Sequence, residues 1–184
     1  MKAAVFYGPG DIQIKDISYP ELEPDGIIIK VNCCGICGSD LHPYRAGERV
    51  EEGMIMGHEF SGDVVEVGNN VSGINKGDRV AAASYKPCGE CYWCQQGLPQ
   101  RCSNMKILGY AFPGAFAEYV GIPIATLNRT VFMLPDEVSY TAGATVEPLS
   151  VGVHAARRAQ PSPEDTVVVM GAGTIGLCTM QSLR

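Results

Sequence analysis

Short apolar runs separated by turn residues make up the first part of the chain. Residues 27–31, 62–67 and 78–82 are rich in Ile, Val and Ala and have the length of strands. Gly, Pro and Asn cluster between these runs, as they do in tight turns. Residues 115–120 form a fourth candidate strand. Strands this short, at this spacing, predict an antiparallel barrel or sandwich.

The pattern changes after Pro135. Ser139 is expected to cap a short helix, and residues 147–159 are expected to form a longer one that ends in arginines. Residues 166–170 are an uninterrupted apolar run rich in β-branched residues, which predicts a buried parallel strand. The later part of the chain is therefore expected to be α/β.

Composition narrows the possible partners. The chain has 184 residues and a net charge of −6, and it contains no cluster of Lys and Arg. This charge argues against nucleic acid or an anionic membrane as a partner. The chain has no apolar run long enough to cross a bilayer, and its first residues form no basic leader. We therefore expect a cytoplasmic protein.

Four of the eight cysteines lie close together in the sequence and are spaced C-x2-C-x2-C-x7-C. They are Cys88, Cys91, Cys94 and Cys102. Four thiolates at this spacing can close a tetrahedral shell around one zinc ion, and a closed shell is structural because it leaves no position for a substrate. The remaining cysteines include Cys33, Cys34 and Cys178, which we interpret as small buried hydrophobic residues.

A glycine motif follows the predicted strand at residues 166–170. Gly171, Gly173 and Gly176 form G-x-G-x-x-G and precede a segment that can be helical. Such glycines let the backbone approach a pyrophosphate at a helix N-terminus, so the motif predicts dinucleotide binding. The acidic residue that selects NAD over NADP lies about 20 residues further on. Because that position lies beyond Arg184, we expect a chain that ends inside its cofactor domain, and NAD and NADP both stay open.

A second group of residues can bind metal. Cys37, His58 and Glu147 offer one thiolate, one imidazole and one carboxylate. A catalytic zinc has three protein ligands and one exchangeable position, which this set would provide. From spacing alone, Cys37 could equally be a core residue, and Glu147 could be a first-turn residue favoured by the helix dipole.

The motifs together resemble those of the zinc-containing medium-chain dehydrogenases. Their order is a Cys-Gly-Ser-Asp segment at Cys37, a Gly-His-Glu segment at Gly57, the four-cysteine lobe and the glycine turn. The segment around Glu147, with the sequence Glu-Pro-Leu-Ser-Val-Gly-Val-His-Ala, resembles the sorbitol dehydrogenase or polyol branch. The resemblance covers the chain from Met1 to its end.

The resemblance implies a mainly β GroES-like barrel followed by the start of a Rossmann domain. The barrel would cover residues 1–158, with the structural zinc lobe at residues 87–103. The dinucleotide-binding domain would begin at residue 159 and continue to residue 184. Relatives of this kind are commonly homo-oligomers, which we also expect of the full-length protein.

The resemblance also implies roles for individual residues. Cys37 and His58 would bind the catalytic zinc, and either Glu59 or Glu147 would be the third ligand. Ser39 and His42 would relay a proton. Asp40 would orient a zinc ligand such as His58.

The implied activity is zinc-dependent hydride transfer between a secondary alcohol or polyol and NAD or NADP. A threonine-type dehydrogenase of the same family is an alternative substrate class. A metal-free quinone or enoyl reductase fits poorly, because such relatives lack the Cys/His/Glu set and the lobe. A zinc-stabilised binding or assembly domain without activity is the rival from another class. The 184-residue chain by itself is expected to show little or no turnover.

Overall fold

The computed structural model describes residues 1–184. A five-stranded antiparallel sheet in the order β8-β3-β4-β5-β9 forms the centre of the molecule. Its strands are β3 (Ile27–Gly35), β4 (Glu59–Val67), β5 (Arg79–Ala82), β8 (Tyr119–Ile122) and β9 (Val131–Met133). The sheet confirms the three predicted strands at residues 27–31, 62–67 and 78–82. The fourth strand is shifted, because it begins at Tyr119 rather than at residue 115.

The main core lies against this sheet. It consists of apolar side chains from the strands and from the loops that cross them: Ile27, Ile29, Phe60, Val64, Ile74, Val80, Ala82, Leu108, Ala115, Val120, Ile122, Ala125 and Val131. Many of them are at most 1% exposed, as is expected where β-branched side chains pack on a pleated surface. No residue between positions 88 and 102 belongs to this core.

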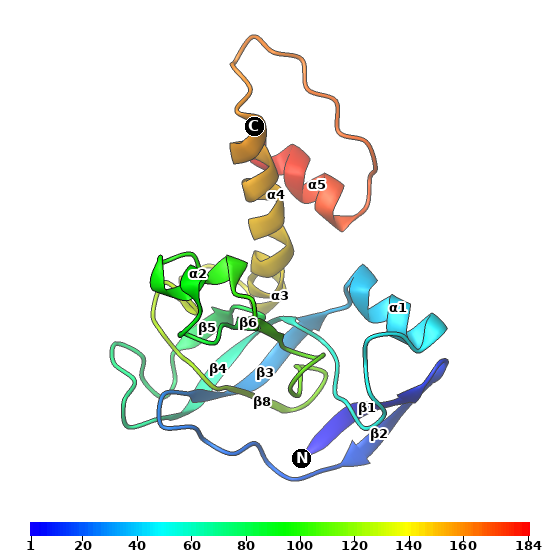
Figure 1. Cartoon of the computed structure of the whole chain (residues 1–184), viewed down its shortest axis with the longest axis vertical. Coiled ribbons are helices and arrows are strands. Elements are labelled where there is room, and N and C mark those ends of the chain that lie inside the picture. The colour runs from blue at the N-terminus through cyan, green and yellow to red at the C-terminus, as the bar shows by residue number, and fades with distance from the viewer.

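Two small antiparallel pairs flank the sheet. A hairpin formed by β1 (Lys2–Gly8) and β2 (Asp11–Asp16) lies at the periphery beside α1 (Gly38–Ala46) (Figure 1). The short strands β6 (Tyr85–Lys86) and β7 (Lys106–Ile107) close the base of the cysteine lobe. The lobe contains α2 (Tyr92–Gln95) and the 3₁₀ turn η1 (Pro99–Arg101).

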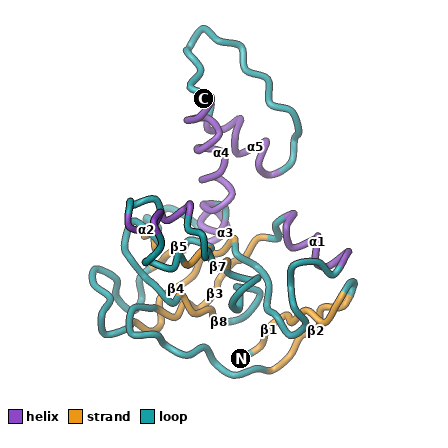
Figure 2. Tube along the Cα trace, viewed as in Figure 1, coloured by secondary structure: helices purple, strands orange, loops and turns teal.

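The helices after the sheet agree with the sequence prediction. Helix α3 (Tyr140–Ala144) begins at Ser139, whose Oγ accepts a hydrogen bond from the Ala142 N–H at 3.1 Å. Helix α4 (Val146–Ala159) rises out of the β-sheet part, and α5 (Thr174–Ser182) packs beside it (Figures 1 and 2).

The predicted parallel strand at residues 166–170 is wrong for this chain. The segment is part of the long loop between α4 and α5 and has no regular structure (Figure 2). Val168 is 79% exposed and Met170 is 94% exposed. A strand exists only with a hydrogen-bonded neighbour, and no other segment of the chain lies beside this one to pair with it. β-Branched composition alone therefore did not produce a strand.

Candidate metal centres

The four lobe cysteines converge on one point. Their sulfur atoms all lie within 4.8 Å of one another. The Sγ–Sγ distances are 3.4 Å for Cys88–Cys102, 3.6 Å for Cys91–Cys94 and 3.9 Å for Cys91–Cys102. A tetrahedron of sulfurs about 2.3 Å from a central zinc has edges of about 3.8 Å. The cluster therefore has the dimensions of a zinc–tetrathiolate shell, and no pair is bonded as a disulfide.

Backbone amides in the lobe point at these sulfurs. The Cys88 N–H donates to Cys102 Sγ at 3.2 Å, and the Cys91 N–H donates to Cys88 Sγ at 3.4 Å. Backbone N–H groups of Cys94 and Ser103 lower the pKa of the Cys91 thiol to about 6, whereas desolvation raises the pKa of the neighbouring Cys94 thiol to about 12. Hydrogen bonds to the thiolate favour its charged form, which is the form that binds metal.

A second cluster brings together Cys37, His58 and Glu59. One donor atom from each lies within 4.8 Å of the other two. Cys37 is the N-cap of α1, His58 immediately precedes β4, and Glu59 is the first residue of that strand. His58 and Glu59 are 6% and 7% exposed. A buried imidazole beside a buried carboxylate and a thiol is an arrangement that a divalent cation would stabilise.

Asp40 connects the helix to the histidine. Its Oδ2 accepts the Cys37 N–H at 2.8 Å, and Oδ1 lies 3.7 Å from His58 Nδ1. Neither Oδ1 nor Nδ1 has a hydrogen-bond partner within 3.5 Å, although both are buried. The carboxylate favours a proton on Nδ1 and so leaves the lone pair on Nε2. Nε2 is the nitrogen on the side of Ser39, whose Oγ is 3.5 Å away.

Glu147 lies near this cluster but outside it. Its Oε1 accepts a hydrogen bond from Ser84 Oγ at 3.2 Å. Burial raises the pKa of the Glu147 carboxyl group, while the neighbouring His58 and the Ser84 hydroxyl act in the opposite direction. Of the two acidic candidates, Glu59 is therefore the one the fold brings into the three-residue group.

The other predicted site residues are placed as follows. Ser39 and His42 lie on α1, three residues apart, and His42 is exposed. In the glycine turn, Gly171 has a φ of +101° and the helix begins after Gly173. A Cβ at Gly176 would collide with the carbonyl oxygen of Gly171. These are the tight turn and the close helix approach that the glycines were expected to allow.

The chain's likeness to known proteins agrees with this geometry. Residues 23–136 match the family model described as the alcohol dehydrogenase GroES-like domain. The chain belongs to this family. The GroES-like family assignment confirms the predicted fold class.

Three relatives of this GroES-like chain are informative. Sorbitol dehydrogenase of Bacillus subtilis (strain 168) is 38% identical over 189 residues, which cover 100% of this chain and 52% of the relative. The crystal structure of galactitol-1-phosphate dehydrogenase from Escherichia coli is 34% identical with a TM-score of 0.90, and the match covers 100% of this chain and 52% of that structure. An alcohol dehydrogenase structure from E. coli CFT073, complexed with NADH, is 33% identical with a TM-score of 0.89, and the match covers 100% of this chain and 52% of that structure. The chain thus spans about half the length of these relatives.

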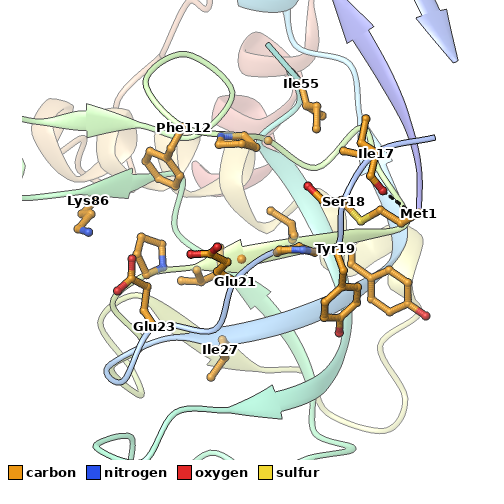
Figure 3. Close-up of a pocket in the computed structure, with 18 of the residues that line it drawn as sticks. Met1, Ile17, Ser18, Tyr19, Glu21, Glu23, Ile27, Ile55, Lys86 and Phe112 are labelled. Atoms are coloured by element: carbon orange, nitrogen blue, oxygen red, sulfur yellow. Dashed lines mark hydrogen bonds between the residues drawn. The ribbon is translucent and has the colours of Figure 1, made fainter. Parts of the chain in front are cut away.

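One cavity of the structure lies away from both metal-ligand clusters. A cavity of about 450 Å³ opens between the segment from Ile17 to Glu23 and the loop at Phe112 (Figure 3). Its lining contains none of the cysteines, none of the histidines and neither Glu59 nor Glu147.

No helix of the chain has both the length and the apolar character that crossing a membrane requires.

Two residues that matter to the second cluster were missed in the sequence. Gly35 pairs with Glu59 across β3 and β4, and a Cβ there would lie 2.5 Å from Glu59 Oε2. The glycine therefore makes room for the carboxylate. Tyr110 donates from its OH to the Ser39 carbonyl at 2.8 Å and holds the first turn of α1. Gly35 precedes the Cys37 motif and could have been noticed, whereas nothing local marks Tyr110.

The three spare cysteines differ from expectation. Cys33, Cys34 and Cys178 are half-buried rather than buried. Cys33 and Cys34 lie near the end of β3, where the strand leaves the core, and Cys178 lies on α5. Burial raises the pKa of the Cys34 thiol to about 12, so this thiol stays protonated and chemically inert at neutral pH.

The orientation of His58 by Asp40 gives a testable expectation. In Asp40→Asn, the amide oxygen can still accept the Cys37 N–H, but the amide NH₂ would face His58 Nδ1. That donor favours a lone pair on Nδ1 and moves the proton to Nε2, which is the wrong tautomer for a ligand. We expect the zinc ion at the cluster containing His58 to bind about 10- to 100-fold more weakly and the zinc ion in the cysteine lobe to keep its affinity. Competition with a chromophoric chelator measures both affinities.

Asp63→Asn is the matched control, because Asp63 bonds Asn32 and Tyr140 and lies outside both clusters. It should leave both affinities unchanged. Equal affinities in Asp40→Asn and the original chain would show that Asp40 does not orient the histidine.

Proposed function

We propose that this chain is the zinc-carrying part of an oxidoreductase that moves a hydride between a secondary alcohol or polyol and a nicotinamide cofactor. The observation that carries the proposal is the cluster of Cys37, His58 and Glu59. Three donors of different kinds leave one coordination position open, whereas the four lobe thiolates leave none. The names of the sorbitol and galactitol-1-phosphate dehydrogenases support a polyol substrate, and the relative solved with NADH supports the nicotinamide cofactor.

The two clusters have different proposed roles. Cys37, His58 and Glu59 would hold a catalytic zinc. Glu147 lies close enough that the charges of His58 and Glu59 affect the pKa of its carboxyl group. Cys88, Cys91, Cys94 and Cys102 would hold a structural zinc. Zinc held in the first cluster would supply Lewis acidity toward an alcohol or carbonyl oxygen. A purely structural, non-catalytic zinc domain is the weaker reading, because it gives no reason for the three-donor cluster.

The residues around the first cluster can position and move a proton. Asp40 fixes the ring of His58, and the Ser39 hydroxyl lies on the side of the ligating nitrogen. A substrate hydroxyl bound there would give its proton to Ser39 Oγ while the Ser39 hydroxyl releases its own proton to the ribose of the bound cofactor, towards His42. His42 follows one turn later on the same helix and is exposed, so it can pass the proton to water.

The proposed domain organisation places the boundary between residues 158 and 159. Residues 159–184 would begin the dinucleotide-binding domain, which the φ of Gly171 and the tight approach at Gly176 support. The cofactor carries the hydride, and the protein supplies binding and orientation. Eight free cysteines fit a reducing compartment such as the cytoplasm.

Turnover by the full-length protein tests the activity. Sorbitol and other secondary alcohols are offered with NAD⁺ or NADP⁺, and reduction of the cofactor is followed by absorbance. We expect activity that a chelator removes and that added zinc restores. Activity that persists in metal-free protein, or no oxidation of any alcohol or polyol by zinc-loaded protein, would contradict the proposal.

A further inference from the structure

Strand β2 has a free edge. It pairs only with β1, and all six of its residues are exposed. Ile14 is 68% exposed and Ile12 is 38% exposed. In Figure 1 the hairpin lies at the outside of the molecule, with β2 as its outer strand. An exposed edge with apolar side chains is a template for pairing with another strand.

The hydrogen bonds of the hairpin show which backbone groups are free. Met1 and Ile17 exchange both of their backbone bonds, at 2.8 Å and 2.9 Å. Bonded pairs alternate along an antiparallel ladder, so Lys15 and Gln13 also direct their backbone groups to β1. The even-numbered residues of β2 therefore point N–H and C=O outward.

No other part of the chain uses these outward groups. None of the backbone bonds outside helices and strand ladders involves Ile12, Ile14 or Asp16. No side chain bonds to their backbone either. The edge thus carries a row of unpaired donors and acceptors.

The sequence of β2 is complementary to itself in one register. Two copies related by a two-fold axis at Gln13 would set Ile12 opposite Ile14 of the second copy. The same register sets Asp11 opposite Lys15, so two opposite-charge pairs form by symmetry. The outward residues face each other in this register, as an antiparallel ladder requires.

Other registers fit less well. An axis between two residues would set an outward residue against an inward one. An axis at Ile14 satisfies the backbone but places Ile12 against Asp16 and Lys15 against Gln13. The register centred on Ile14 leaves Asp11, Lys15 and Asp16 opposite uncharged residues, whereas the register centred on Gln13 pairs Asp11 with Lys15.

Apolar surface beside β2 adds to the contact. Ile12 and Ile14 line an open groove of about 580 Å³ together with Ile36 and Phe116. Ile36 is 72% exposed. In the paired arrangement the four isoleucines of the two strands lie on one face of the sheet and form a continuous apolar stripe next to this groove.

We propose that β2 is the contact at which two copies of this chain associate, through a four-stranded antiparallel sheet in the order β1-β2-β2-β1 with its axis at Gln13. The interface is isologous, since each copy presents the same edge. It does not depend on the metal clusters or on the proposed activity.

Charge exchange tests both the contact and its register. The original 184-residue chain is expected to dimerise with rising concentration in sedimentation velocity. Asp11→Lys and Lys15→Asp each replace two opposite-charge pairs by two like-charge pairs, and each should raise the Kd about tenfold or more. An equimolar mixture of the two variants should form a heterodimer, because every pair across the axis is then complementary. The chain that carries both changes should dimerise again.

The mixture also serves as the control for folding, since only folded strands can pair in it. A monomeric original chain at every concentration would overturn the proposal. Dimers of unchanged strength in both single variants would overturn it too, because the contact would then lie elsewhere. Weakened single variants that fail to associate when mixed would exclude the register centred on Gln13.

Discussion

Replacing Cys102 by serine is expected to leave one zinc ion per chain instead of two and to unfold the lobe from Cys88 to Cys102. The sulfur of Cys102 lies within 4 Å of those of Cys88 and Cys91 and accepts the Cys88 N–H. Because the lobe contributes no side chain to the main core, we expect metal ligation to be the main interaction that stabilises its fold. Hydrogen exchange should show lost protection in residues 88–102 and unchanged protection in β3 and β4.

Cys178→Ser is the matched control for this change. Cys178 is half-buried, lies on α5 and belongs to neither cluster. It should keep both zinc ions and a protected lobe. A Cys102→Ser chain that keeps two zinc ions, or that unfolds throughout, would contradict the assignment of the lobe as a separate metal-held unit.

Replacing Cys37 by alanine in the full-length protein is expected to lower kcat/KM for alcohol oxidation by about a thousandfold. Lewis-acid assistance contributes several kcal/mol, and each 1.36 kcal/mol changes the rate about tenfold. The variant should lose one zinc ion and keep the other, because the lobe cysteines are untouched. Steady-state kinetics and metal analysis on the same sample measure both effects.

Cys33→Ala provides the comparison. Cys33 lies on β3, four residues before Cys37, and is half-buried. Its sulfur belongs to neither metal-ligand cluster. Its activity and zinc content should equal those of the original protein. Retention of full activity by Cys37→Ala, with no loss of zinc, would remove Cys37 from the catalytic role.

Local patterns carried much of the fold. The apolar runs at residues 27–31, 62–67 and 78–82 became central strands, because each places β-branched side chains on a buried face. Ser139 caps α3 as its residue type predicts. The hairpin β1–β2 was missed, since β2 is exposed throughout and shows no alternation of buried and exposed positions.

The sequence predictions that failed or stayed open depend on contacts with residues far away in the sequence. The run at residues 166–170 reads as a strand, but it lacks a neighbouring strand in this chain. The sequence left Glu59 and Glu147 as equal candidates. In the fold Glu59 joins the group with Cys37 and His58, because Gly35 opens space for its carboxylate, while Ser84 binds Glu147. The role of Glu59 as the third ligand stays a prediction.

Zinc titration of the metal-free chain, followed by native mass spectrometry, counts the zinc ions that the chain binds. We expect one chain to hold two independent zinc sites of different chemistry, one with four thiolates and one with Cys37, His58 and Glu59. The predicted result is two bound ions, falling to one in His58→Ala and to one in Cys102→Ser. A single bound ion in the original chain, unchanged by His58→Ala, would show that Cys37, His58 and Glu59 do not form a zinc site.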